Sequence, residues 1–311
     1  MKRIPVIGLM MVFAVCVQAA NENWMTGLPD TVRVCRVSIP GTHDSGTAGV
    51  WFPMRHYART QSMDLAEQWD AGIRFFDLRP KLDGDRLRIY HGPASCHITF
   101  DESLLILKHK IEENPTEFCI VMTNSAGGGR KAVDMTMEQI RKSIPDNMLA
   151  VFKPDMTVAD IRGRILFIHR NEPSAGTAVP GCVTRGWPGN GMFQGAQLVS
   201  AGSETATLWA QDCYTSGNSD SDAYLDVKWR MMEHLLGIFT KTDETVWCIN
   251  HASGYTGTGV STNIKKNART TNARLLEYLD THKAPVGIVP MDFPQQELID
   301  AIIFLNTFAA E

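Results

Sequence analysis

Titratable side chains follow directly after short apolar runs in this chain. The first case is His43-Asp44, which comes after the apolar run Val34 to Ile39 and a Pro40-Gly41 pair that predicts the end of a strand. Catalytic groups of α/β proteins collect at the carboxyl ends of parallel strands, so this position is a candidate for chemistry. A histidine there titrates near neutral pH and can accept or donate a proton.

The same pattern recurs along the chain. Polar or charged residues end nearly every apolar run, namely Thr42-His43-Asp44, Asp77-Leu78-Arg79, His91-Gly92-Pro93, His169-Arg170, Gln211-Asp212-Cys213-Tyr214, Asn250-His251 and Met291-Asp292. Turn residues with no role in chemistry would explain one or two such places, but not this many. The pattern therefore predicts a functional cluster at one edge of the fold.

The elements that must position this cluster are alternating strands and helices. The predicted strands are Val34–Ile39, Ile73–Leu78, Leu87–Tyr90, Phe118–Met122, Ile165–Ile168, Leu208–Ala210, Val246–Ile249 and Val286–Val289, and the predicted helices are Met63–Asp70, Ser103–Asn114, Met137–Ser143, Asp222–Phe239 and Asn267–His282. Eight such strands with crossover helices predict an α/β fold, a single distorted (β/α)8 barrel of the TIM type that is closed or incompletely closed. The connection from Arg79 to Arg86 is too short for a helix, so it predicts a hairpin or an irregular crossing.

Two histidines from separate strands can act as a general base and a general acid on opposite sides of a reacting centre. The planar, permanently charged guanidinium groups of Arg79 and Arg170 match the geometry of phosphate oxygens and indicate a phosphoester substrate. The chain lacks a GxSxG elbow and the HExxH and CxxC metal spacings. These residues favour metal-free phosphodiester cleavage without a cofactor.

The first 20 residues predict a signal peptide that is cleaved after Ala19 or Ala20 and an exported protein, periplasmic or secreted. Lys2-Arg3 precede an apolar run from Ile4 to Val17 that is too short for a membrane span. Lipid attachment at Cys16 is an alternative. The remaining 21–311 are expected to form one domain.

The composition limits which partners the protein can bind and indicates the state of its cysteines. Loss of Lys2 and Arg3 would change the formal net charge from −4 to −6, which gives no electrostatic case for nucleic acid. Six cysteines remain, widely spaced, and Cys119 and Cys248 lie in apolar runs typical of buried thiols.

Several motifs carry a family resemblance. Ser38-Ile39-Pro40-Gly41-Thr42-His43-Asp44-Ser45, Arg74-Phe75-Phe76-Asp77-Leu78-Arg79 and Tyr90-His91-Gly92-Pro93, in this order and spacing, resemble the X-domain of bacterial phosphatidylinositol-specific phospholipase C, of the PLC-like phosphodiesterase superfamily. Weaker matches follow over nearly all of 21–311: Asn114-Pro115-Thr116-Glu117, Arg162-Gly163-Arg164-Ile165, Trp187-Pro188, Trp247-Cys248-Ile249-Asn250 and Val289-Pro290-Met291-Asp292.

The resemblance implies a role for each matched residue. His43 would deprotonate the inositol 2-hydroxyl, Asp292 would orient His43, Arg79 would hold the phosphate oxygens, and His91, helped by Asp44, would protonate the leaving diacylglycerol oxygen. Asp77, Arg170, Asp212 and Tyr214 would bind substrate. The substrate would be phosphatidylinositol, free or as a glycan-linked anchor, and the product inositol 1,2-cyclic phosphate. No metal requirement is expected, because Arg79 stands where calcium-dependent relatives have a carboxylate.

Some features leave alternatives open. Asn124 stands where bacterial members carry a basic residue, for which Arg130 or Lys131 would have to compensate. Val50-Trp51-Phe52 and the segment from Gly186-Trp187 to Met192-Phe193 either contact a membrane transiently or cap the barrel mouth, and His169 and His251 would be supporting partners. The chain is expected to act as a monomer. A metal-dependent glycerophosphodiester phosphodiesterase and a non-catalytic inositol-lipid binding module remain as competing functions.

Overall fold

The fold is described from a computed structural model that covers residues 21–215, 221–242, 245–257 and 262–308. The predicted signal peptide at 1–20 lies outside these residues. Within them, no helix has the length and apolar character needed to cross a membrane.

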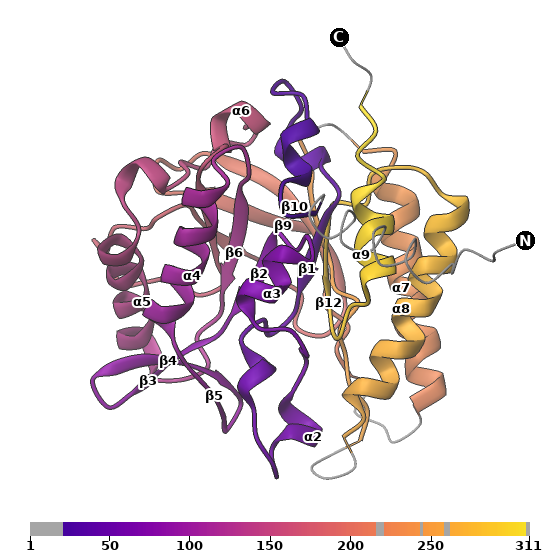
Figure 1. Ribbon diagram of the computed structural model, residues 1–311, viewed down its shortest axis with the longest axis horizontal. Coiled ribbons are helices and arrows are strands. Elements are labelled where there is room, and N and C mark those ends of the chain that lie inside the picture. Colours follow the sequence, from indigo (N-terminus) through magenta and orange to yellow (C-terminus); the bar gives the residue numbers. More distant parts are fainter. Residues whose placement is uncertain (1–20, 216–220, 243–244, 258–261, 309–311) are drawn as a thin grey trace, which may run out of the picture.

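A closed barrel forms the centre of the molecule (Figure 1). Its described strands, in order around the barrel, are β1 (Ile39–Thr42), β12 (Ile288–Met291), β11 (Trp247–Asn250), β10 (Thr205–Gln211), β9 (Met192–Ser200), β8 (Cys182–Arg185), β7 (Ile165–His169), β6 (Cys119–Thr123) and β2 (Phe75–Leu78). Among these described strands, only β9 runs antiparallel to its neighbours. The predicted distorted α/β barrel is confirmed, although β8 and β9 were not predicted.

The expected third barrel strand lies elsewhere. It is β4 (Arg86–His91), the middle strand of a separate antiparallel sheet with β3 (Pro80–Asp83) and β5 (Ala94–Thr99). Leu87 and Ile89 are buried while Arg88 and Tyr90 are half-buried, an alternation typical of a sheet with one covered face rather than of a barrel strand. The placement of Leu87–Tyr90 in the barrel was wrong, whereas the predicted hairpin at 79–86 is confirmed.

The first strand also begins later than predicted. Val34–Arg36 is a 3-10 helix, and β1 includes Pro40 and Gly41 instead of ending at them. The carbonyl of Pro40 accepts a hydrogen bond from Arg74 N at 3.0 Å. Proline has no N–H to donate, and on this side of Pro40 the neighbouring strand β2 has not yet begun, so no strand hydrogen bond is lost. A Cβ on Gly41 would lie 2.8 Å from the Phe75 ring, so the strand requires glycine there.

Helices cover the barrel on two sides (Figure 1). The five predicted helices correspond to α3 (Leu65–Asp70), α4 (Phe100–Glu113), α5 (Gly129–Ser143), α7 (Ser221–Phe239) and α8 (Ile264–Thr281). Short elements add α2 (Arg55–Ala58), α6 (Val158–Ile161), α9 (Gln296–Ile303) and the 3-10 turns Trp24–Gly27, Thr47–Gly49 and Asp146–Met148. A capping box between Thr99 and Glu102 explains why α4 begins earlier than predicted.

Both faces of the barrel strands are buried. Phe75 and Leu166 pack into a cluster without residues of α4, α5, α7 or α8, whereas their neighbours Phe76 and Phe167 pack into a cluster with those helices. This explains the continuous apolar runs in the sequence. All six described cysteines are buried free thiols.

Candidate active site

A cavity of about 310 Å³ opens at the carboxyl ends of the parallel strands. Its described lining is His43, Thr60, Arg79, His91, Asn124, Arg170, Gly189, Asp212, Tyr214, Gly254, Tyr255, Ile264 and Asp292. Seven of the predicted site residues therefore meet here, while Asp44 and Asp77 are buried and do not line the cavity. Residues that end separate strands therefore lie together at one edge of the fold.

His43 follows β1, and backbone and side-chain contacts fix its ring. Its Nδ1 lies 2.8 Å from Asp292 Oδ1, so Nδ1 donates and the carboxylate accepts. Its carbonyl accepts a hydrogen bond of 2.7 Å from Gln61 Nε2. Burial lowers the pKa of His43, but the carboxylates of Asp292 and Asp44 more than offset this, so the pKa lies above its ordinary value. The Nε2 atom is left as the proton acceptor.

Arg79 follows β2 and connects His43 to two carboxylates. Its Nε lies 2.9 Å from Asp44 Oδ1, and its Nη2 lies 3.0 Å from Asp77 Oδ2 and 2.8 Å from His43 Nε2. Burial would lower the pKa of Arg79, but Asp44 and Asp77 outweigh it and raise the pKa. Arg79 always donates, so its contact with Nε2 fits neutral His43. Asp77 thus orients Arg79 rather than facing the cavity.

His91 ends β4 and reaches the cavity from the separate antiparallel sheet. Its Nδ1 donates to the carbonyl of Ala58 at 2.7 Å, and its Nε2 lies 3.5 Å from Asp44 Oδ2. The same Asp44 oxygen lies 3.3 Å from His43 Nε2. Asp44 adopts a positive φ of 46°, a conformation disfavoured for residues other than glycine and frequent at functional sites. One carboxylate oxygen therefore lies close to the Nε2 atoms of both imidazoles.

The opposite side of the cavity holds Arg170, Asp212 and Trp187. Arg170 Nη1 lies 3.4 Å from Asp212 Oδ2, the Trp187 indole N–H donates to the same oxygen at 2.9 Å, and the guanidinium lies 4.4 Å from the Trp187 ring centre. Burial would raise the pKa of Asp212, but His251, Arg170 and the Trp187 hydrogen bond keep it well below its ordinary value. Trp187, which is half-buried, thus packs against both members of the charged pair.

Two tyrosines form the outer part of this side. The rings of Tyr214 and Tyr255 are stacked with centres 6.2 Å apart, and both line the cavity. Such a pair presents an apolar face suited to a sugar or cyclitol ring.

Asn124 faces the cavity where a basic residue was expected from the resemblance. Arg130 lies in the first turn of α5 and donates to the Pro173 carbonyl at 2.9 Å. In the part of the chain that is described, neither Arg130 nor Lys131 lines the cavity. The expected compensation by these two residues is therefore not seen.

Residues that support the site were only partly predicted. His251 packs edge-on against His43 and Trp187, with ring centres 5.8 Å apart in both cases, and burial lowers its pKa to about 3. Lys228, on the buried face of α7, donates to Gln211 Oε1 at 3.1 Å, and burial lowers its pKa to about 8. His251 could be found from its position after a strand, whereas nothing in the sequence distinguishes Lys228 from surface lysines.

His169 has a structural role instead. Its Nε2 donates to the Pro180 carbonyl at 2.8 Å, so its Nδ1 accepts from the Thr123 hydroxyl at 2.7 Å. Burial lowers its pKa to about 4.

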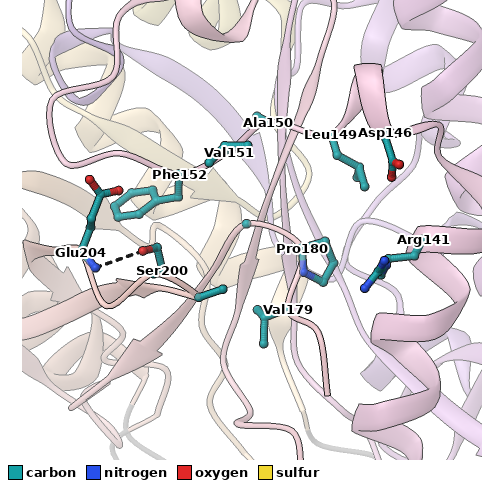
Figure 2. Close-up of a pocket in the computed structure, with 13 residues that line it drawn as sticks. Arg141, Asp146, Leu149, Ala150, Val151, Phe152, Val179, Pro180, Ser200 and Glu204 are labelled. Carbon is teal, nitrogen blue, oxygen red and sulfur yellow. Dashed lines mark hydrogen bonds between the residues drawn. The ribbon is translucent and has the colours of Figure 1, made fainter. Parts of the chain in front are cut away.

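Another cavity, of about 430 Å³, lies away from the active site. Figure 2 shows its lining residues. Its lining joins Leu149, which bridges to the first residue of β7, with Ser200, the last residue of the antiparallel β9. Of its charged residues, Arg141 and Asp146 lie on one side and Glu204 lies on the other (Figure 2). This cavity has no convergent acid–base groups. Across the described residues, no group of three or more His, Cys, Asp or Glu side chains could hold a metal ion.

The chain is similar to known proteins over most of its length. It is 26% identical over 300 residues to the 1-phosphatidylinositol phosphodiesterase of Listeria monocytogenes, covering 93% of this chain and 86% of the relative. The structure of the Listeria phosphatidylinositol-specific phospholipase C matches with a TM-score of 0.75 at 23% identity, covering 93% of this chain and 99% of that one. A structure from work on the membrane binding of the Staphylococcus aureus phosphatidylinositol-specific phospholipase C matches with a TM-score of 0.78 at 20% identity. The match covers 94% of this chain and 99% of that one. No protein-family model matches the chain. The resemblance predicted from the motifs is thus confirmed, and this chain is a relative of the bacterial phosphatidylinositol-specific phospholipases C.

Proposed function

We propose that this protein is a metal-independent phospholipase C that cleaves phosphatidylinositol to diacylglycerol and inositol 1,2-cyclic phosphate. The observation that carries the proposal is the position of Arg79 and two histidines at one cavity, with Asp292 on the far side of His43. A binding module needs neither a general base nor a general acid. The names and coverage of the relatives agree with this activity.

In the first step, neutral His43 takes the proton of the inositol 2-hydroxyl at Nε2. The 2-oxygen forms a bond to phosphorus, and Asp292 stabilises the resulting imidazolium through Nδ1, which it contacts at 2.8 Å. Arg79 lies 2.8 Å from the same Nε2, so it faces the phosphate oxygens and neutralises the charge that develops on them.

In the second step, protonated His91 gives the proton on Nε2 to the diacylglycerol oxygen as the phosphorus–oxygen bond to it breaks. Its Nδ1 is held by the Ala58 carbonyl, which leaves Nε2 as the donor towards the cavity. The carboxylate of Asp44 lies 3.5 Å from this Nε2. Slow hydrolysis of the cyclic ester follows when the two histidines exchange roles.

The inositol ring binds on the far side of the cavity. Arg170 and Asp212 hydrogen-bond to ring hydroxyls, and Tyr214 stacks on a ring face. Trp187 positions both charged groups, and Asp77 positions Arg79.

Contact with the membrane is made by the loop before α2. Trp51 is 69% exposed and Phe52 is 79% exposed, whereas Val50 is buried. Exposed large aromatic side chains favour the headgroup zone of a bilayer. We further propose that the protein acts as an exported monomer, with 1–20 as its signal peptide and 21–311 as its single catalytic domain.

The test is incubation with phosphatidylinositol vesicles in excess chelator, followed by phosphorus NMR. The proposal expects the cyclic phosphate signal at an undiminished rate. Activity that disappears in chelator and returns with calcium would contradict the metal-independent mechanism, and binding without turnover would contradict enzymatic activity.

A further inference from the structure

Lys228 is a buried charge that the proposed mechanism does not use. It is 1% exposed and follows the buried Tyr224 by one turn of α7, so the two side chains lie on the same face of the helix. The Tyr224 hydroxyl donates to the Cys213 carbonyl at 2.9 Å, and a Cβ on Gly254 would collide with that hydroxyl. Gly254 lines the active-site cavity, so this face of α7 packs directly against the cavity lining.

The ammonium of Lys228 reaches the strand ends through Gln211. Its Nζ donates to Gln211 Oε1 at 3.1 Å, and the same oxygen accepts from Cys213 N at 2.7 Å. Gln211 Nε2 donates to the His251 carbonyl at 2.8 Å. Gln211 therefore connects Lys228 both to the end of β10, where Asp212 stands, and to the end of β11.

The charge of Lys228 has no direct counter-charge among the described residues. Its described hydrogen-bond acceptor is a neutral amide, and no described carboxylate forms an ion pair with it. Burial lowers the pKa of Lys228 to about 8, while Asp212, Cys213 and Asp292 oppose this fall. The ammonium is therefore positive at neutral pH, and its field reaches the cavity because a buried charge is screened less than an exposed one.

The charged side chains of the cavity are negative in sum without Lys228. The described ones that line the cavity or form ion pairs with its arginines are the carboxylates Asp44, Asp77, Asp212 and Asp292 and the guanidinium groups Arg79 and Arg170. Four negative charges face two positive ones, and one negative charge remains even when His91 is protonated. A phosphodiester adds another, so a further positive charge near this cavity favours its binding.

We propose that Lys228 is a positioning residue for the anionic substrate, because its buried charge offsets Asp212 and Asp292 and allows the cavity to hold a phosphodiester. Asp212 can then accept hydrogen bonds from ring hydroxyls as a carboxylate while its repulsion of the phosphate held by Arg79 is reduced. The inference rests on the proposed function, since it concerns the substrate that this function requires. A role of Lys228 as a hydrogen-bond donor to Gln211 alone is the alternative that the test must separate.

The test measures dissociation constants at pH 7 for two ligands that share the inositol ring and differ in charge, anionic inositol 1-phosphate and neutral myo-inositol. Lys228→Met removes both the charge and the hydrogen bond, whereas Lys228→Gln removes the charge and keeps a donor for Gln211. Both variants should bind inositol 1-phosphate about tenfold more weakly than wild type, the size expected for the loss of one partly screened charge. Both should bind myo-inositol at the wild-type level.

Lys241→Met is the matched control, because Lys241 is exposed and lies beyond the end of α7. It should bind both ligands as the wild type does. Thermal midpoints identify the folded variants, and Lys228→Gln carries the comparison if Lys228→Met does not fold.

Losses of equal size for the two ligands would overturn the proposal, because they would show a purely structural role for Lys228. Wild-type affinity of Lys228→Gln for inositol 1-phosphate would also overturn it, because the hydrogen bond to Gln211 and not the charge would then be what matters. A wild-type protein that binds neither ligand would instead contradict the proposed function, so the two failures can be distinguished.

Discussion

The imidazole rings of His43 and His91 lie 6.4 Å apart with their planes at 81°, and one oxygen of Asp44 lies within 3.5 Å of the Nε2 atom of each. The two rings thus face the same cavity from different strands. Their other nitrogens differ, because Nδ1 of His43 binds a carboxylate whereas Nδ1 of His91 binds a backbone carbonyl. This difference favours His43 as the base.

Asp292→Asn should shift the acidic side of the pH profile to lower pH. The pKa of His43 is raised, and a general base works only when neutral, so kcat/KM should rise with pH through a value above 6.5 in the wild type. Without the Asp292 carboxylate this pKa falls, and kcat falls by roughly 10³-fold or more. The profile of the exposed Asp280→Asn variant is the control, and an unshifted acidic side in Asp292→Asn would refute the assignment.

Arg79→Met should shift the same part of the profile in the opposite direction. Arg79 lowers the pKa of His43 from 2.8 Å, so its removal raises that pKa and moves the acidic side to higher pH. The loss of phosphate contacts should also reduce kcat by roughly 10²- to 10³-fold. A shift in the same direction for Arg79→Met and Asp292→Asn would show that the profile does not report His43.

Buried neutral histidines should make stability depend on pH. The pKa of His169 is lowered to about 4, so below pH 6.5 the unfolded chain takes up a proton that the folded chain does not. The free energy of unfolding should therefore fall as the pH drops from 6.5 towards 4, by about 1.4 kcal/mol for each unit of the pKa shift.

The check is the thermal midpoint of wild type and His169→Gln across this range. The variant should lose less stability on acidification than the wild type. His43 contributes with the opposite sign, since its raised pKa stabilises the fold below pH 6.5, but this contribution is common to both proteins and cancels. Parallel curves for the two proteins would contradict the prediction.

Trp51 and Trp187 should separate membrane binding from catalysis. Burial of an exposed aromatic side chain in the bilayer contributes about 1.5–3 kcal/mol, so Trp51→Ala should weaken binding to vesicles by roughly 10- to 100-fold and leave turnover of a soluble substrate unchanged. Trp187→Ala should do the reverse, because Trp187 holds Asp212 and Arg170. Similar behaviour of both variants in the two assays would count against this division.

Much of the fold follows from local signals. Strands such as Cys119–Thr123 are apolar throughout because both faces are buried, and this makes them easy to predict. β9 was missed because Phe193, Gln194 and Gln197 are exposed and interrupt its apolar pattern. The inclusion of Pro40 in β1 depends on where β2 begins, which is a tertiary property.

The site was predictable where a residue's type reveals its chemistry. His43, Arg79 and His91 could be found because they end strands in one order and spacing. The supporting contacts of Gln61 and Lys228 could not, because they depend on packing between distant segments. The position of Asp77 beneath Arg79 likewise required the fold.

The assignment of His43 as general base and His91 as general acid is tested most directly by changing the leaving group. In an inositol phosphate ester of 4-nitrophenol, the leaving group is 4-nitrophenolate, which departs without a proton. The diacylglycerol oxygen needs a proton to leave. His91→Ala should therefore lose roughly 10²- to 10⁴-fold in kcat on phosphatidylinositol but little on the nitrophenyl ester, while His43→Ala should lose this much on both. Equal losses of His91→Ala on the two substrates would contradict its role as the general acid.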